Sequence, residues 1–150
     1  MLSVKEQMNM NKKCIDVIKL SVPNKPEYVS VIRLTASGIA NRMGFDIEKI
    51  EDIKVAISEA CTNAITHGIC KEEANFNVDF YSHEEKLVIS VYDNGKGCLN
   101  HNIKTPNLKE PKEGGLGVFI IRSLMDDVEI SSNNGKGTVI KMTKYVGDDI

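Results

Sequence analysis

Apolar and polar residues alternate along five short stretches of the chain, which is the pattern expected of β-strands that bury one face. The first stretch begins at Ile15, continues to Val22 and stops at Pro23. Residues 83–85 join the second stretch to the third, and a strong hairpin-turn sequence at 133–137 joins the last two. The pattern therefore predicts five strands, at residues 15–22, 75–81, 86–92, 128–131 and 138–145.

Three other stretches place apolar residues at the three- and four-residue spacing of an α-helix. The first begins near Pro26, where the missing N–H of proline costs nothing, and Gly44 ends it. The second covers residues 47 to about 67 after a capping Asp46, and the third covers residues 116–125. The apolar positions assigned to the first two helices are Val29, Ile32, Leu34, Ile39 and Met43, then Ile50, Ile53, Ile57, Ala60 and Ala64.

The elements follow one another in the order β-α-α-β-β-loop-α-β-β. This order predicts an α/β (α+β) two-layer sandwich, with a mixed, mostly antiparallel sheet covered on one face by helices. Residues 14–150 are expected to form a single domain, and the polar residues 1–13 a flexible N-terminal tail. Residues 93–115 are rich in Gly, Asn, Pro and Lys without any period, and so long a loop in a compact domain is usually either functional or disordered.

Composition and charge exclude several classes of function. The 150 residues are 41% hydrophobic and 27% charged, which is ordinary for a globular protein, and the net charge of −2 gives no basic field for direct nucleic-acid binding. No apolar stretch approaches the ~18 residues that span a bilayer, and the N-terminus does not resemble a signal peptide. The four cysteines are irregularly spaced without a C-x-x-C pair, so no zinc site is expected. We therefore expect a cytoplasmic protein with reduced thiols and no membrane contact.

The second predicted helix carries the first candidate for chemistry. Glu59 and Asn63 are four residues apart and therefore project from the same helical face. A carboxylate beside a carboxamide can orient a nucleophile and ligate Mg²⁺ through oxygen. The alternative interpretation is two solvated polar residues on an amphipathic helix.

A second candidate follows the strand at 86–92, in the sequence from Asp93 to Gly97. An acid at a strand end can accept a hydrogen bond from an amino group such as that of adenine. The glycines at 95 and 97 let the backbone approach a flat ring without interference from a Cβ atom. The alternative here is a simple Asn-Gly turn.

A third candidate is the glycine-rich sequence of residues 113–117, which leads into the third predicted helix. Glycines before a helix leave free N–H groups at the positive end of its dipole, where phosphates bind. Neither G-x-x-x-x-G-K-[ST] nor G-x-G-x-x-G occurs, which excludes a P-loop and a Rossmann site. Gly137-Thr138 at the last strand is first a hairpin turn, and any nucleotide contact by Thr138 is additional.

Taken in order, these motifs resemble the GHKL (Bergerat) ATP-binding fold that histidine kinases and gyrase B share. Within that superfamily the chain is similar to the RsbW (sigma-B type) and SpoIIAB anti-sigma kinases. The similarity to RsbW lies in the segments 25–35, 40–45 and 142–145, and it covers about residues 15 to 146.

The resemblance implies a role for each motif residue. Glu59 matches the general base, Asn63 the Mg²⁺ ligand, and Arg33 a position used in partner binding. The loop from Cys98 to Glu113 corresponds to the lid over ATP. The residues expected to bind the nucleotide are Asn63, Asp93, Gly95, Gly97, Gly114, Gly115, Leu116, Gly117 and Thr138.

The same resemblance implies the function. The chain is expected to use ATP and Mg²⁺ to phosphorylate a serine of a STAS-type anti-anti-sigma factor, and to sequester a sigma factor as a homodimer. Two alternatives remain: a switch kinase of the RsbT type, or a nucleotide-binding anti-sigma module without kinase activity. The intact Glu59 favours retained chemistry, because a pure binder has no physical need for that carboxylate.

Overall fold

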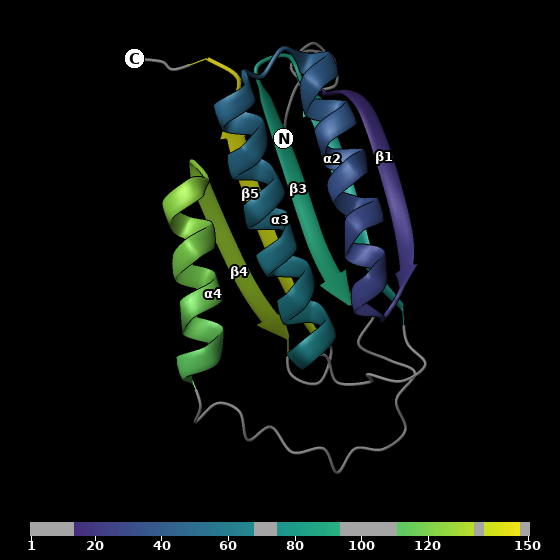
Figure 1. Ribbon diagram of the computed structural model, residues 1–150, viewed down its shortest axis with the longest axis vertical. Helices are drawn as coiled ribbons and strands as arrows, with labels where there is room; N and C mark the ends of the chain where they lie inside the picture. The colour runs from purple at the N-terminus through teal and green to yellow at the C-terminus, as the bar shows by residue number, and fades with distance from the viewer. Residues whose placement is uncertain (1–13, 68–74, 94–110, 134–136, 148–150) are drawn as a thin grey trace, which may run out of the picture.

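A computed structural model of the chain describes residues 14–67, 75–93, 111–133 and 137–147, in two layers (Figure 1). Three helices lie side by side on one face of a five-stranded sheet, and the sequence predicted this arrangement of helices. The elements, in chain order, are β1 (Cys14–Pro23), the 3-10 turn η1 (Pro26–Tyr28), α2 (Val29–Met43), α3 (Ile47–His67), β2 (Asn75–His83), β3 (Lys86–Asp93), α4 (Pro111–Leu124), β4 (Asp127–Asn133) and β5 (Gly137–Tyr145). None of these helices is long and apolar enough to cross a membrane.

The sheet has the strand order β1-β2-β3-β5-β4, and all four pairings between described strands are antiparallel. The expectation of a mixed sheet was wrong. The single helix between β3 and β4 does leave these two strands running in the same direction, but β5 lies between them and pairs antiparallel with both. Glu84 and Glu85 alone connect β2 to β3, a tighter hairpin than predicted.

The core lies between the sheet and the helices. Alternate residues of the strands point into it, among them Phe76, Val78 and Phe80 of β2. In α2 the buried positions are Val29, Ile32, Ala36 and Ala40. Leu34 was expected on that face but is 72% exposed, because it lies two residues after Ile32 and so about 200° around the helix.

Cys61 is a buried thiol in the C-terminal half of α3. Burial in the core raises the pKa of this thiol to about 12. It therefore stays protonated at neutral pH and behaves as a small apolar side chain.

Helix α3 begins where the sequence predicted. The backbone N–H of Lys49 donates to Oδ1 of Asp46 at 2.9 Å, which is the hydrogen bond of an N-capping residue. Gly44 ends α2 with a left-handed φ of 96°, and its N–H bonds back to the carbonyls of Ala40 and Asn41. These two caps fix the corner between α2 and α3.

Candidate functional site

The predicted site residues gather at one end of the molecule. Figure 1 shows the C-terminal end of α3, the end of β3, the start of α4 and the start of β5 together at the lower end of the view. Gly95 and Gly97 lie outside the described residues, as do residues 98–110 of the predicted lid. The described site residues form two clusters, one between helices and one on the sheet.

The first cluster joins α3 to α4. Gly117 of α4 is buried, and a Cβ atom added to it would lie 3.2 Å from Oε1 of Glu59. The same Cβ atom would lie 3.5 Å from both Oδ1 and Nδ2 of Asn63. The two half-buried polar side chains of α3 therefore converge on one point of the α4 backbone, and a side chain at Gly117 would press on the carboxylate of Glu59.

The glycine-rich sequence was expected to precede the helix, but its glycines lie within α4. Helix α4 begins at Pro111, five residues before the predicted start, and includes Gly114, Gly115 and Gly117. In an α-helix only the first four N–H groups lack a partner within the helix, so the amides of Gly115 and Gly117 are not free donors. Gly117 thus matters through its missing side chain. Leu116 beside it is 64% exposed.

The second cluster joins the ends of β3 and β5. A Cβ atom added to Gly137 would lie 1.9 Å from Oδ1 of Asp93, which is closer than any real contact. Gly137 also has a φ of +91°, a conformation that favours glycine. The carboxylate of Asp93 therefore lies directly against the bare backbone of Gly137, and its Oδ1 is buried from solvent. A nucleotide contact was predicted for Thr138 but not for Gly137, although a glycine directly before Thr138 could have indicated a close approach of the backbone.

Thr138 is exposed and pairs with Ser132 across the β4–β5 hairpin. On its other side, β5 pairs antiparallel with β3, and Val139 lies opposite Tyr92. The next residue of β3, Asp93, and the preceding residue of β5, Thr138, therefore lie at the same end of these two strands. A carboxylate and a hydroxyl at neighbouring strand ends can recognise the amino edge of a purine by hydrogen bonds.

The helical cluster also fits a magnesium ion. Oδ1 of Asn63 is an oxygen ligand of the kind that Mg²⁺ prefers, and it faces the same point of α4 as the carboxylate of Glu59. Among the described residues, no group of three or more His, Cys, Asp and Glu side chains could hold a metal by itself. An ion bound here would take its remaining ligands from phosphate oxygens and water, as Mg²⁺ does in nucleotide sites.

Comparison with known sequences first identifies the class of protein to which this domain belongs. Residues 22–144 match the family described as "Histidine kinase-like ATPase domain". The match includes both clusters of the site, the three helices, strands β2 to β4 and all but the last residue of β5. The fold and the motifs therefore define a domain of this class.

Known relatives then narrow the class. The chain is 46% identical over 143 residues to "Serine-protein kinase RsbW" of Oceanobacillus iheyensis, covering 89% of each chain. It is 42% identical over 144 residues to the protein of the same name from Bacillus pumilus, covering 88% of this chain and 87% of that one. This chain belongs to the RsbW family of serine-protein kinases.

Solved structures agree on the fold. A structure of the RsbU and RsbW domains of Rv1364c from Mycobacterium tuberculosis superposes with a TM-score of 0.65 at 19% identity, over 87% of this chain and 32% of that chain. The SiaB-SiaC complex from Pseudomonas aeruginosa superposes with a TM-score of 0.54 at 11% identity, over 97% of this chain and 99% of that chain. At these identities the likeness shows the architecture alone.

Substituting Gly117 with alanine tests the helical cluster. Alanine is the better helix former by ~1 kcal/mol, so the free energy of unfolding should stay the same or rise. Its methyl group would nevertheless displace Glu59 and Asn63, and we expect the phosphorylation rate to fall about tenfold or more. Gly38→Ala is the matched control, because Gly38 also lies within a helix, α2, and a Cβ atom there meets nothing within 4 Å. Equal rates for the two variants would show that the close approach at Gly117 is irrelevant to activity.

Proposed function

We propose that this chain is an ATP-dependent serine-protein kinase that also acts as an anti-sigma factor. The convergence of Glu59 and Asn63 on Gly117 carries the proposal, because a carboxylate, which can accept a proton, and a carboxamide, which can ligate Mg²⁺, meet at one point of the site. Membership of the RsbW family of serine-protein kinases supports it independently. Intact Glu59 distinguishes this proposal from a nucleotide-binding module without chemistry.

The nucleotide spans the two clusters in this proposal. Asp93 accepts a hydrogen bond from the adenine amino group, and Thr138 completes the contact beside Gly137. The phosphates lie toward the start of α4, where the positive end of the helix dipole favours negative charge. Gly95 and Gly97 remain predicted to lie close to the base.

The phosphoryl transfer follows from these positions. The Oγ atom of a partner serine attacks the γ-phosphorus of ATP while the bond from that phosphorus to the β,γ-bridging oxygen breaks, and ADP leaves. Glu59 orients the serine hydroxyl and accepts its proton. Asn63 holds Mg²⁺, which when bound neutralises charge on the phosphates. Most of the catalysis is therefore positioning and electrostatic stabilisation, not covalent chemistry.

Partner binding is assigned to α2. Arg33 is exposed there and is followed by Leu34, which is 72% exposed, while Tyr28, directly before α2, is 38% exposed. Arginine and tyrosine among apolar side chains are favoured anchors of protein interfaces. We propose that this surface contacts a sigma factor or a STAS-type antagonist, and that the chain is a homodimer. A location in the cytoplasm stays a prediction.

The experiment is to purify the tagged chain with its partners from the native cell and to incubate them with Mg²⁺ and ATP. We expect a sigma factor and a small STAS protein, with phosphate appearing on one serine of the latter, and weaker recovery of at least one partner by Arg33→Ala. A bound sigma factor without any phosphorylation would favour the alternative of an anti-sigma module. Phosphorylation of the STAS protein with no sigma factor bound would favour the RsbT-type switch kinase.

A further inference from the structure

A lysine lies in the core at the end of the molecule opposite the candidate site. Lys144 is 8% exposed, and its position in β5 follows the inward-facing Ile140 and Met142. A buried ammonium group destabilises a protein unless its charge is paired and its protons are hydrogen-bonded. Its partners therefore identify what the lysine holds together.

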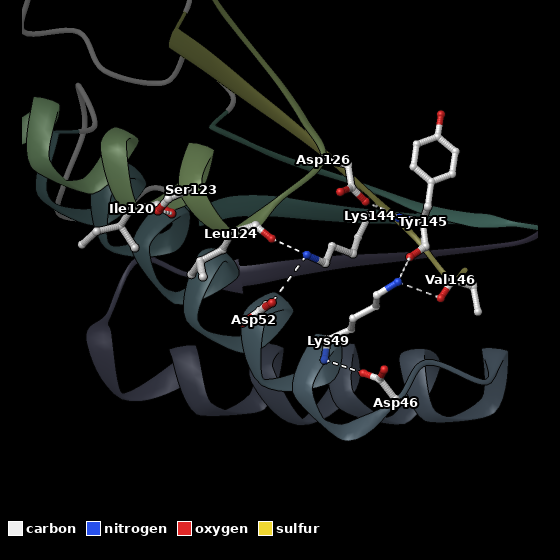
Figure 2. A network of polar contacts seen from close by, with 10 residues as sticks. All are labelled: Asp46, Lys49, Asp52, Ile120, Ser123, Leu124, Asp126, Lys144, Tyr145 and Val146. Carbon is white, nitrogen blue, oxygen red and sulfur yellow. Dashed lines mark hydrogen bonds and ion pairs between the residues drawn. The ribbon is translucent and has the colours of Figure 1, made fainter. Parts of the chain in front are cut away.

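Figure 2 shows those partners. The Nζ atom of Lys144 donates to the backbone carbonyl of Leu124, the last residue of α4, and lies 3.5 Å from Oδ2 of Asp52 in α3. A positive charge at a helix C-terminus satisfies an unpaired carbonyl and interacts favourably with the helix dipole. One ammonium group thus joins β5, α3 and the end of α4.

The backbone on both sides of Lys144 is also fixed. The N–H of Asp126 donates to the carbonyl of Thr143 at 2.9 Å, and the N–H of Tyr145 donates to Oδ2 of Asp126 at 2.7 Å. From α3, Nζ of Lys49 donates to the carbonyls of Tyr145 at 3.2 Å and Val146 at 2.9 Å. Hydrogen bonds therefore hold the β5 backbone on both sides of Lys144, and from this position its ammonium group can hold the C-terminal end of α4 in place.

The spacing along the two helices connects this anchor to the site. Asp52 precedes Glu59 by seven residues in α3, and Leu124 follows Gly117 by seven residues in α4. Seven residues are two helical turns, about 10.5 Å, and return to nearly the same face. The two helices run antiparallel. The ammonium group of Lys144, which contacts Asp52 of α3 and Leu124 of α4, and the approach of Gly117 to Glu59 therefore connect the same two helices, two turns apart.

We propose that Lys144 and Asp52 are positioning residues for phosphoryl transfer. They fix α4 along the axis of α3, and thereby keep Gly117 against Glu59 and Asn63. The expected loss of rate rests on the proposed kinase function, whereas the expected displacement of α4 does not. Displacements of about 1 Å at a reacting centre lower rates by ~100-fold, so a small slide of α4 is enough to matter.

The test is the double variant Asp52→Asn with Lys144→Met, which removes the pair without leaving one charge buried and unpaired. Its control is Glu51→Gln with Lys54→Met, because these residues form an exposed ion pair at 3.1 Å on the same helix. We expect the folded double variant to lose about tenfold or more in kcat, with KM for ATP changed less than about threefold, and the control to keep the values of the unmodified chain. We expect adenine binding to be retained, because Asp93 and Gly137 lie at the opposite end of β3 and β5 from Lys144. Urea unfolding confirms that each variant is folded when it is assayed.

Two readouts separate positioning from stability. Gly117→Ala should cost less in the double variant than in the unmodified chain, because both changes disturb the same contact. A crystal structure of the double variant should show α4 displaced along α3. An unmodified kcat with α4 in place would overturn the positioning role. If the unmodified chain phosphorylates no partner, the proposed function fails, and the structure of the double variant still decides whether the pair positions α4.

Discussion

The variant Glu59→Gln will bind ATP about as tightly as the unmodified chain but will phosphorylate its partner ~10²–10⁴-fold more slowly. Glutamine keeps the size and the half-buried position beside Gly117, so the cluster between α3 and α4 stays assembled. It cannot accept the proton of the serine hydroxyl. Calorimetry measures nucleotide binding, and initial rates of phosphate incorporation into the partner measure the chemistry.

Glu48→Gln is the control for removing one negative charge from α3, because Glu48 is an exposed acid in the first turn of the same helix. It should leave both measurements unchanged. A Glu59→Gln variant that worked at the normal rate would exclude Glu59 as the base. Loss of ATP binding together with activity would instead assign Glu59 to the nucleotide or its metal.

The variant Gly137→Ala will lose nucleotide affinity about tenfold or more. Two effects combine at this residue: a non-glycine side chain at φ +91° costs roughly 1–2 kcal/mol, and the new methyl group would overlap the carboxylate of Asp93. Asp93 must then move from the place where it meets adenine. Calorimetry gives the affinity, and urea unfolding gives the loss of stability.

Gly44 offers a matched control for the first effect alone. Its φ is +96°, close to that of Gly137, but a Cβ atom there meets nothing within 4 Å. Gly44→Ala should therefore destabilise the fold by a similar backbone strain and leave nucleotide affinity unchanged. If both variants bound ATP normally, the contact between Gly137 and Asp93 would not belong to the adenine site.

The sequence was enough to predict most of the secondary structure, because each element buries one face. The alternation of Phe76, Val78 and Phe80 marks β2, and the Asp46 cap marks the start of α3. The start of α4 was missed because three glycines, poor helix formers, outweighed Pro111, which is favoured at a first helical position.

The pairing of distant segments could not be predicted in the same way. Nothing local to β3 or β4 indicates that β5 lies between them, since that depends on contacts across the whole sheet. For the same reason the motifs gave the residues of the site without the contact of Gly117 with Glu59 or of Gly137 with Asp93. Lys144 did leave a signal that was overlooked: a charged residue in the inward register of an alternating strand.

The buried thiol of Cys61 links folding to alkaline pH. An unfolded thiol loses its proton near pH 9.0, whereas the folded chain holds it up to about pH 12. The folded state therefore binds the proton more tightly, and this contribution to stability is complete below about pH 9 and declines as the pH rises toward 12. Because oxidants and alkylating agents attack the thiolate, Cys61 is also inert at neutral pH, although it lies only two residues from Glu59. An oxidising environment thus has no direct chemical route to the centre of α3 through this side chain.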